Sequence, residues 1–293
     1  MRAAIGLMLI VLALVLLPSG CEKNPGAPNY QKEITVFGYL WGNDTLNAER
    51  AIMIAYTQPV LARYDLENAA IRGASVTLTE TSTGHVYTLS ESTQKPGFYF
   101  NDNLVVQPKT TYNLEVRADG KVVTASTTVP PILKLTTVLS PDHVNSAYQQ
   151  NLSRDKPIFL EGEFPDQIVL VDVYCQEPYW NAEYTESFGG GRHPRNEEEY
   201  DGGVDGEPRH IRAMARLGEL VSDDYPGQYV VNWYSSMIVF YGSNTMQVLA
   251  IDDNFHRFLY TEHPVYSGGV NGGLGVFGSV CGETYQLMIL KKP

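Results

Sequence analysis

The sequence has little positive charge. Its 21 lysine and arginine residues are outnumbered by 33 aspartate and glutamate residues, so the formal net charge at pH 7 is −12. A surface of this sign repels the phosphate backbones of DNA and RNA, which bind proteins largely through lysine and arginine. The composition therefore argues against nucleic acid as a partner.

Cysteine is also scarce. The chain has three cysteines, and Cys21 stands at the end of an apolar run near the N-terminus. Cys175 and Cys281 remain, and an oxidising compartment would allow them to form a disulfide bond. The alternative is a pair of separate buried thiols, and the sequence leaves both interpretations open.

Catalytic motifs are missing as well. The sequence contains neither the G-x-S-x-G motif of a nucleophilic serine nor the H-E-x-x-H motif of a zinc hydrolase. His193 and His210 lack the paired spacing of a transition-metal site. Asp252 and His256 would share a helix face and could serve acid–base chemistry, although a helix cap with a surface ion pair is the simpler interpretation. We expect no enzyme activity, no metal and no cofactor.

Long hydrophobic runs are absent except at the N-terminus, where residues 3–17 are apolar apart from one glycine and follow the single charge of Arg2. A transmembrane helix needs about 20 apolar residues, so this run suits a secretory signal better. The following Pro-Ser-Gly-Cys resembles a bacterial lipoprotein signal, with Pro18 where that signal usually has leucine. We expect a signal peptide over residues 1–20 and a lipid on Cys21 that holds the body at a membrane. An uncleaved anchor and an ordinary secreted protein are the alternatives.

Residues 21–31 are rich in proline, glycine and asparagine and show no alternation. Such a composition is typical of a flexible connection, and we expect it to tether the lipid to the folded body.

The first half of the body has the pattern of short β-strands. Residues 75–80 alternate between apolar and threonine side chains, and Asp119-Gly120 is a strong hairpin signal. Seven short strands in about 100 residues are typical of an immunoglobulin-like sandwich, which we predict over residues 32–130. Pro130-Pro131 cannot lie in a central strand and marks the predicted domain boundary.

Residues 131–293 predict a second, mostly β domain. Asp252-Asp253 is expected to begin a short helix, and residues 284–290 are expected to form the closing strand. A polar insertion over residues 176–208 carries acidic residues among glycines, which are expected to be a solvated loop, with a Ca²⁺ site as the alternative. The insertion also carries Tyr179, Trp180 and Tyr184, a set of aromatic side chains that we expect to contact a ligand or partner.

A glycine-rich segment near the C-terminus fits G-x-G-x-x-G over residues 273–278. A dinucleotide site needs a helix directly after this loop, and none is expected here. The glycines more simply allow close packing of backbones. Gly273, Gly275 and Phe277 are also predicted to border a partner site.

Several segments together resemble a known family. The opening strand at residues 34–40, the strand at 73–78, the hairpin segments at 111–116 and 125–130, and above all the glycine-rich residues 271–278 are similar to DUF4249, a family of bacterial lipoproteins found mainly in Bacteroidetes. The resemblance implies no particular activity. It implies a place at the cell outer membrane, beside a TonB-dependent receptor, with the periplasmic or surface face left open.

These observations predict a mainly β lipoprotein without catalytic activity, acting as a binding or accessory subunit of the cell envelope. The alternatives are a lipoprotein that binds a glycan or peptide alone, and a hydrolase whose site is assembled from distant residues.

Overall fold

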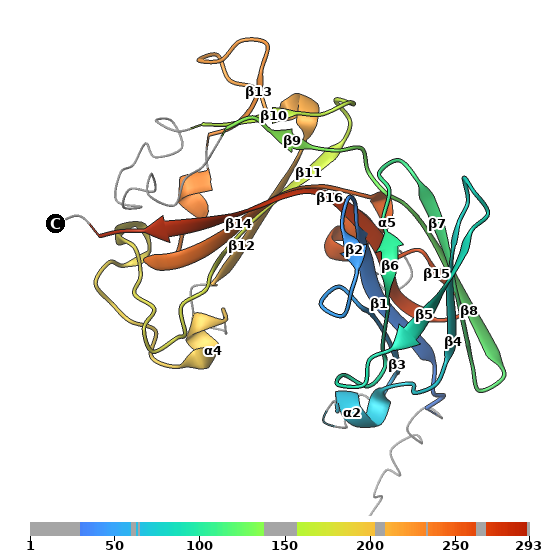
Figure 1. The fold of residues 1–293 in the computed structure, drawn as a ribbon. Helices are drawn as coiled ribbons and strands as arrows, with labels where there is room; N and C mark the ends of the chain where they lie inside the picture. The colour runs from blue at the N-terminus through green and yellow to red at the C-terminus, as the bar shows by residue number, and fades with distance from the viewer. Residues whose placement is uncertain are drawn as a thin grey trace, which may run out of the picture.

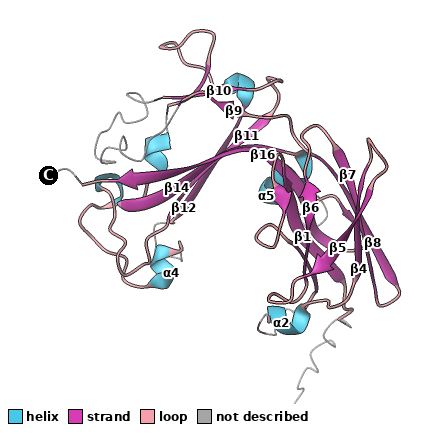
Figure 2. Ribbon diagram, in the orientation of Figure 1, coloured by secondary structure: helices cyan, strands magenta, loops and turns pink. Residues whose placement is uncertain are grey.

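The structure is a computed structural model that describes residues 30–59, 63, 65–137, 157–202, 209–232, 234–261 and 268–291. The predicted signal peptide at residues 1–20, the lipidation site Cys21 and all of the tether except residues 30 and 31 lie outside the described residues. The fold is mainly β with a short helix, as predicted, and Figure 1 shows two lobes joined by one long strand. In Figure 2 the few helices lie beside the sheets.

Most helices and strands belong to one lobe or the other. The N-terminal lobe contains β1 (Ile34–Trp41), β2 (Thr45–Leu46), β3 (Ile52–Tyr56), α2 (Leu66–Ala69), β4 (Ser75–Glu80), β5 (Val86–Glu91), β6 (Phe98–Val105), β7 (Thr111–Ala118) and β8 (Lys121–Thr128). The C-terminal lobe contains β9 (Lys134–Leu135), β10 (Ile158–Glu161), β11 (Ile168–Cys175), η2 (Glu186–Phe188), α4 (Glu197–Tyr200), β12 (His210–Arg216), η3 (Leu217–Glu219), β13 (Tyr229–Val231), η4 (Tyr234–Met237) and β14 (Gly242–Ile251). The chain then continues through α5 (Asp253–Tyr260), β15 (Val270–Asn271) and β16 (Leu274–Ile289).

One large sheet runs through both lobes. Its strand order is β12-β11-β14-β16-β1-β3-β6-β5-β4-β7-β8-β15, with β2 paired to β6, and a small separate sheet has the order β13-β10-β9. The large sheet curls in the N-terminal lobe, so that β8 and β16, far apart in the strand order, come together, with the Thr127 hydroxyl 2.7 Å from the Ser279 hydroxyl. The immunoglobulin-like topology stays a prediction.

β16 connects the lobes because it changes partner along its length. Its first half pairs in parallel with β1, from Leu274 opposite Thr35 to Val280 opposite Trp41. Its second half pairs antiparallel with β14, from Val280 to Ile289. Since side chains alternate along a strand, the odd-numbered residues share one face and the even-numbered residues share the other.

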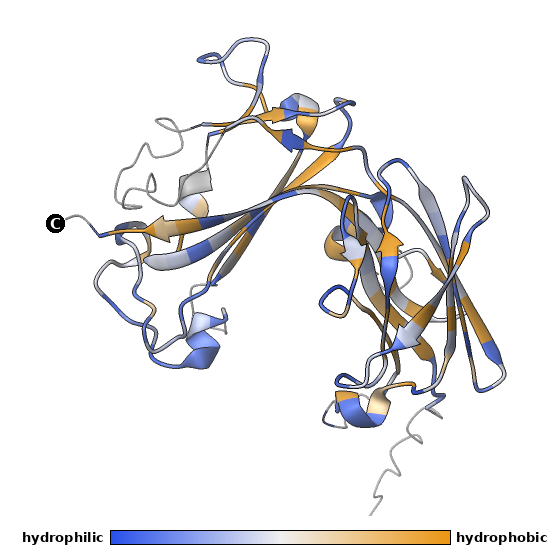
Figure 3. Ribbon diagram, in the orientation of Figure 1, coloured by the Kyte–Doolittle hydropathy of each residue, from blue (hydrophilic) through white to orange (hydrophobic). Residues whose placement is uncertain are grey.

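The odd-numbered face of β16 supplies both cores. Phe277 and Cys281 belong to the N-terminal core, while Leu287 and Ile289 belong to the C-terminal core. The other strands follow the same logic, since Val76 and Leu78 on β4 are buried between more exposed neighbours. Figure 3 shows hydrophobic residues concentrated on the strands, with α4 and many connecting segments hydrophilic.

The residues after the predicted boundary are divided between the lobes. Pro130-Pro131 lies between β8 and β9, and the predicted domain boundary there stays a prediction. Yet β15 pairs with β8, and the first half of β16 pairs with β1, so residues 268–280 lie in the N-terminal lobe. This return of the chain was not predicted.

The two body cysteines are free and buried. Cys175 lies opposite Asn244 on β14, and Cys281 lies opposite Ala250 on the same strand. Six residues of an extended strand span about 20 Å, whereas the Cα atoms of a disulfide lie about 6 Å apart. The structure therefore shows separate thiols, and the suggested Cys175–Cys281 disulfide would not fit it.

Within the described residues, no helix combines the length and the apolar character needed to cross a membrane.

Gly275 tests the dependence of the fold on the parallel pairing of β16 with β1. Its φ is +107°, and a Cβ added there would meet the backbone oxygen of Val36. We expect Gly275→Ala to destabilise the protein by about 3 kcal/mol or more, because strain and a backbone clash add. The control is Gly120→Ala, at φ +73° with open space around the added carbon, for which only about 1 kcal/mol is expected. Equal urea midpoints for the two variants would contradict the argument.

Candidate functional site

Helix α5 lies where the two lobes meet, and its start is fixed by local sequence. The Asp252 side chain caps the helix by accepting a hydrogen bond of 2.9 Å from the Phe255 backbone N–H. Asp253 forms an ion pair with Arg257 one turn later, at 3.7 Å. The helix cap and surface ion pair are thus both present, and the short helix is confirmed.

The apolar side of α5 packs on the even-numbered face of β16 and on β1. A Cβ added to Gly278 would lie 2.9 Å from Cβ of Phe255, so this glycine lets the helix approach. Phe255 lies 5.0 Å from Tyr39 and Phe258 lies 5.9 Å from Phe37, measured between ring centroids. The helix is therefore packed on both strands that meet at the junction.

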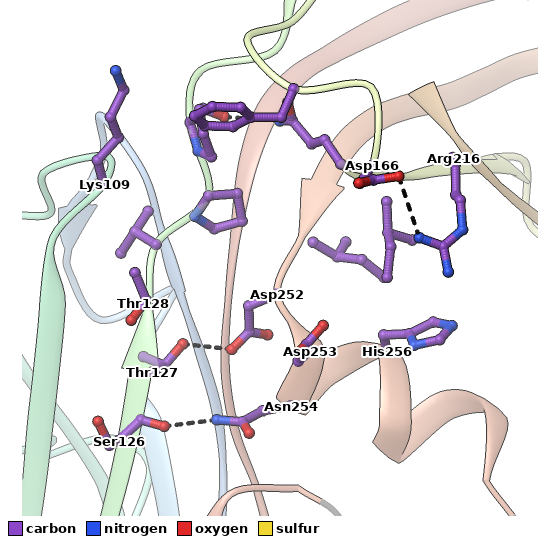
Figure 4. Close-up of a pocket in the computed structure, with 17 residues that line it drawn as sticks. Lys109, Ser126, Thr127, Thr128, Asp166, Arg216, Asp252, Asp253, Asn254 and His256 are labelled. Atoms are coloured by element: carbon purple, nitrogen blue, oxygen red, sulfur yellow. Dashed lines mark hydrogen bonds and ion pairs between the residues drawn. The ribbon is translucent and has the colours of Figure 1, made fainter. Parts of the chain in front are cut away.

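A cleft of about 810 Å³ opens above the start of α5, as Figure 4 shows. This volume is within the range of small-molecule sites, roughly 300–1,000 Å³. Both lobes contribute to its walls. The lining residues are Lys109, Ser126, Thr127, Thr128, Val129, Pro130, Pro131, Phe164, Asp166, Gln167, Ile168, Arg216, Ile251, Asp252, Asp253, Asn254 and His256.

Asp252 joins three elements at the floor of this cleft. Its carboxylate accepts a hydrogen bond of 2.6 Å from the Thr127 hydroxyl on β8, in addition to the bond from α5. The Ser279 hydroxyl on β16 contacts that of Thr127 and donates to the Thr128 carbonyl at 3.0 Å. Asn254 adds a bond of 2.7 Å to the Ser126 carbonyl. Burial raises the pKa of Asp252, although the hydrogen bonds that its carboxylate accepts from Thr127 and Phe255 oppose the shift.

The acid–base pair that Asp252 and His256 suggest does not form in the described structure. The contact between these residues is a backbone hydrogen bond of the helix, from the His256 N–H to the Asp252 carbonyl. The His256 ring instead stacks on Tyr260, with 6.0 Å between ring centroids. The carboxylate of Asp252 therefore serves to hold the junction.

Charged groups at the rim also connect the two lobes. Lys109 of the N-terminal lobe lies 2.5 Å from Glu163 of the C-terminal lobe, whereas the ion pair of Arg216 with Asp166, at 3.8 Å, lies within the C-terminal lobe. Gln167 is only 8% exposed and donates a bond of 3.1 Å to the Pro131 carbonyl, while its Oε1 atom has no hydrogen-bond partner in the described part of the chain. The rim thus combines both signs of charge with a buried amide.

The aromatic residues of the insertion divide into two groups. Trp180 is 69% exposed and meets Tyr179 edge-to-face at 5.4 Å. Tyr184 is fully buried against Phe240, so its predicted contact with a ligand or partner is wrong for this structure. Tyr184 is buried because its ring packs against Phe240, whereas the exposed Trp180 packs against Tyr179.

The insertion is organised around a buried carboxylate that the sequence analysis missed. Glu199 accepts hydrogen bonds from Arg195, from Arg192 and from the Tyr184 hydroxyl. The hydrogen bonds from Arg195 foremost, and the bond from Arg192, lower the pKa of Glu199 to about 2. The sequence suggested that the three consecutive glutamates at 197–199 are all solvated, yet the third of them, Glu199, is buried. The arginines nearby were the available signal.

The glycine-rich segment runs from the turn after β15 directly into β16, so the helix that a dinucleotide site requires is absent at that point. Gly275 and Phe277 are buried, which contradicts their predicted place at a partner surface. A Cβ on Gly273 would lie 2.6 Å from the Ile34 carbonyl oxygen. These residues serve packing.

No group of three or more histidine, cysteine, aspartate or glutamate residues is arranged to hold a metal ion in the described part of the chain. The acidic residues Asp205 and Glu207, which the Ca²⁺ alternative includes, lie outside the described residues.

The fold and site define a two-lobed, mainly β protein with a cleft at the lobe junction. A comparison with protein families matches residues 39–286 to the "Domain of unknown function (DUF4249)", and the chain belongs to this family. No curated protein matches the sequence.

Asp252 offers a test of the junction. Asp252→Ala removes the helix cap and the Thr127 contact, and we expect a loss of about 2 kcal/mol at pH 7. Asp252→Asn keeps a capping oxygen and should lose much less. Because burial raises the pKa above its ordinary value of 3.8, protonation favours the folded wild type, and Asn gains relative to wild type as pH rises. Urea unfolding at pH 7 and near pH 4 measures both effects. A pH-independent difference between Asn and Asp would contradict the burial of this carboxylate.

Glu199 offers a test of the insertion. The lowered pKa means that Glu199 stabilises the fold above its ordinary value of 4.5, and that this contribution is lost as pH falls towards about 2. We expect Glu199→Gln to increase hydrogen exchange and protease cleavage in residues 176–202 at pH 7. The exposed neighbour Glu198→Gln is the matched control and should behave like wild type. Equal protection in both variants would show that the carboxylate does not order the insertion.

Proposed function

We propose that the protein is a non-catalytic lipoprotein of the cell envelope, held at the outer membrane through Cys21 and acting as a binding or accessory subunit of a TonB-dependent receptor. The apolar N-terminal run that ends in Cys21 supports the anchor. That this family is anchored by a lipid is also part of the proposal.

One observation carries the choice of binding over catalysis. Asp252, the best-placed carboxylate of the junction cleft, already accepts hydrogen bonds from α5 and from Thr127. A general base needs a free position within reach of the substrate proton and an oriented partner. Asp252 has structural partners instead, and His256 is turned to Tyr260.

The surface also supports a role in association. The described part of the chain begins at Tyr30, beside the N-terminal lobe (Figure 1). The insertion, which carries Trp180, belongs to the C-terminal lobe. An exposed tryptophan is a frequent anchor of protein interfaces. The lobe farther along the chain from the lipid thus offers a contact for a partner.

A binding lipoprotein that acts alone is the second candidate, and the cleft of about 810 Å³ is the observation that favours it. A hydrolase is the weaker alternative, because its candidate residues are engaged in structural contacts. Asp252 caps α5 and binds Thr127, and His256 stacks on Tyr260.

Purification of the full-length lipidated protein from its native envelope in mild detergent tests the proposal. We expect a receptor of the outer membrane in about equal amount, since a dedicated accessory subunit forms a stable complex. Trp180→Ala should weaken recovery of the receptor, while Val221→Ala, which alters another exposed apolar side chain, should not. Cys21→Ser should release the protein from the membrane fraction. Recovery of the wild type only as a free monomer would contradict the receptor role.

A further inference from the structure

A second surface of the molecule lies on the even-numbered face of β16, beside α5. Strand pairing places Trp41 and Ile251 opposite Val280, on the two sides of β16, and places Leu249 opposite Gly282. Directly paired residues share a face of the sheet. This face therefore continues from β1 in the N-terminal lobe to β14 in the C-terminal lobe.

The face continues further across the C-terminal lobe. Leu170 on β11 lies opposite Leu249 on β14, and Met214 on β12 lies opposite Leu170. Leu170, Leu249, Ile251 and Val280 are buried as one cluster, and Trp41, Met214 and Phe255 pack against it. The face thus has an apolar floor with larger side chains around it.

Aromatic side chains from β1 form one wall. Phe37, Tyr39 and Trp41 alternate onto the same side, and Tyr39 is 38% exposed. A hollow of about 390 Å³ runs beside them and is lined also by Arg50, Phe255 and Phe258 among others. We call this hollow, with the polar groups that face it, the β1 groove.

Both arginines of the β1 groove are paired with a carboxylate, and the Glu49 carboxylate also lines the hollow. The Arg50 guanidinium lies 3.8 Å from the centroid of the Trp41 ring and forms an ion pair of 2.7 Å with Asp44. On the C-terminal lobe, Arg212 forms an ion pair of 3.0 Å with Asp172. The charges of Arg212, Arg50 and Asp172 all act on the Tyr39 hydroxyl, whose pKa is raised chiefly by burial. Groups from both lobes therefore lie near this hydroxyl.

This chemistry selects a ligand class. Arg50 and Arg212 are each neutralised by a carboxylate, and the Glu49 carboxylate and the acidic protein as a whole repel an anion. Both edges of β1 are already paired, so a peptide cannot add to it as a strand. Aromatic faces accept the weakly positive C–H groups of a ring, while guanidinium and carboxylate forks exchange hydrogen bonds with adjacent hydroxyls. A sugar presents both.

We propose that the β1 groove binds a neutral oligosaccharide. The sugar rings lie against the exposed parts of Tyr39 and Trp41, and their hydroxyls meet Arg50 and the Arg212–Asp172 pair. This inference names a ligand class for the proposed binding role, and it does not depend on the receptor.

The test uses the full-length protein in a detergent without a sugar headgroup, so that the detergent does not compete. Maltohexaose, cellohexaose, xylohexaose and chitohexaose are titrated by calorimetry. At least one should bind, and Tyr39→Ala and Trp41→Ala should each weaken its Kd by about tenfold. Val221→Ala, which alters an exposed apolar side chain of the C-terminal lobe, is the control and should leave the Kd unchanged.

Thermal melting in the absence of sugar identifies any variant that fails to fold, and Tyr39, the more exposed of the two, keeps the test valid if Trp41→Ala is unstable. Absence of binding to all four sugars would overturn the inference. So would tighter binding of the anionic hexagalacturonate, or a loss of binding in Trp180→Ala with none in Tyr39→Ala. Receptor recovery is measured separately, so failure here leaves the accessory role to its own experiment.

Discussion

The double pairing of β16 is the interaction on which both lobes depend. A strand of 16 residues gives its first half to β1 and its second half to β14, and its odd-numbered side chains enter two cores in turn. Every backbone group along the strand needs a partner once it is buried, so neither half can leave its neighbour cheaply. The lobes are thus continuous through a hydrogen-bonded sheet as well as through Pro130-Pro131.

The contact of α5 with β16 has a different character, since buried polar groups carry much of it. Asp252 connects the helix to Thr127, and Ser279 connects the same hydroxyl to β16. A partly satisfied network in a poorly solvated site is costly, whereas a complete one fixes a single arrangement. These groups therefore set the position of α5 between the cleft and the β1 groove, and they are unavailable for chemistry. The same helix forms part of both surfaces, through His256 on one side and Phe258 on the other.

Local patterns predicted much of the fold. Alternation identified β4, Asp119-Gly120 marked the hairpin of β7 with β8, and Asp252 marked the start of α5. Most of β16 could not be predicted, because glycines at 273, 275 and 278 look like a loop until a close neighbour is known. That neighbour, β1, lies more than 230 residues away, and parallel pairing over such a separation leaves no local trace. Glu199 and Tyr184 were misjudged for the same reason, since their burial depends on Arg192 and Phe240 folding over them.

The balance of charge separates the roles of the two surfaces. At the junction cleft the ion pair of Lys109 with Glu163 joins one lobe to the other, so these charges contribute to lobe contact. The β1 groove has ion pairs within each lobe, Arg50 with Asp44 and Arg212 with Asp172, so occupation of the groove need not break a contact between lobes. A ligand that displaced this ion pair would have to compensate for its loss, while a neutral sugar in the β1 groove only adds hydrogen bonds to groups already held in place. Preorganised, charge-compensated forks beside aromatic rings favour recognition without conformational change, which is the behaviour expected of a binding subunit.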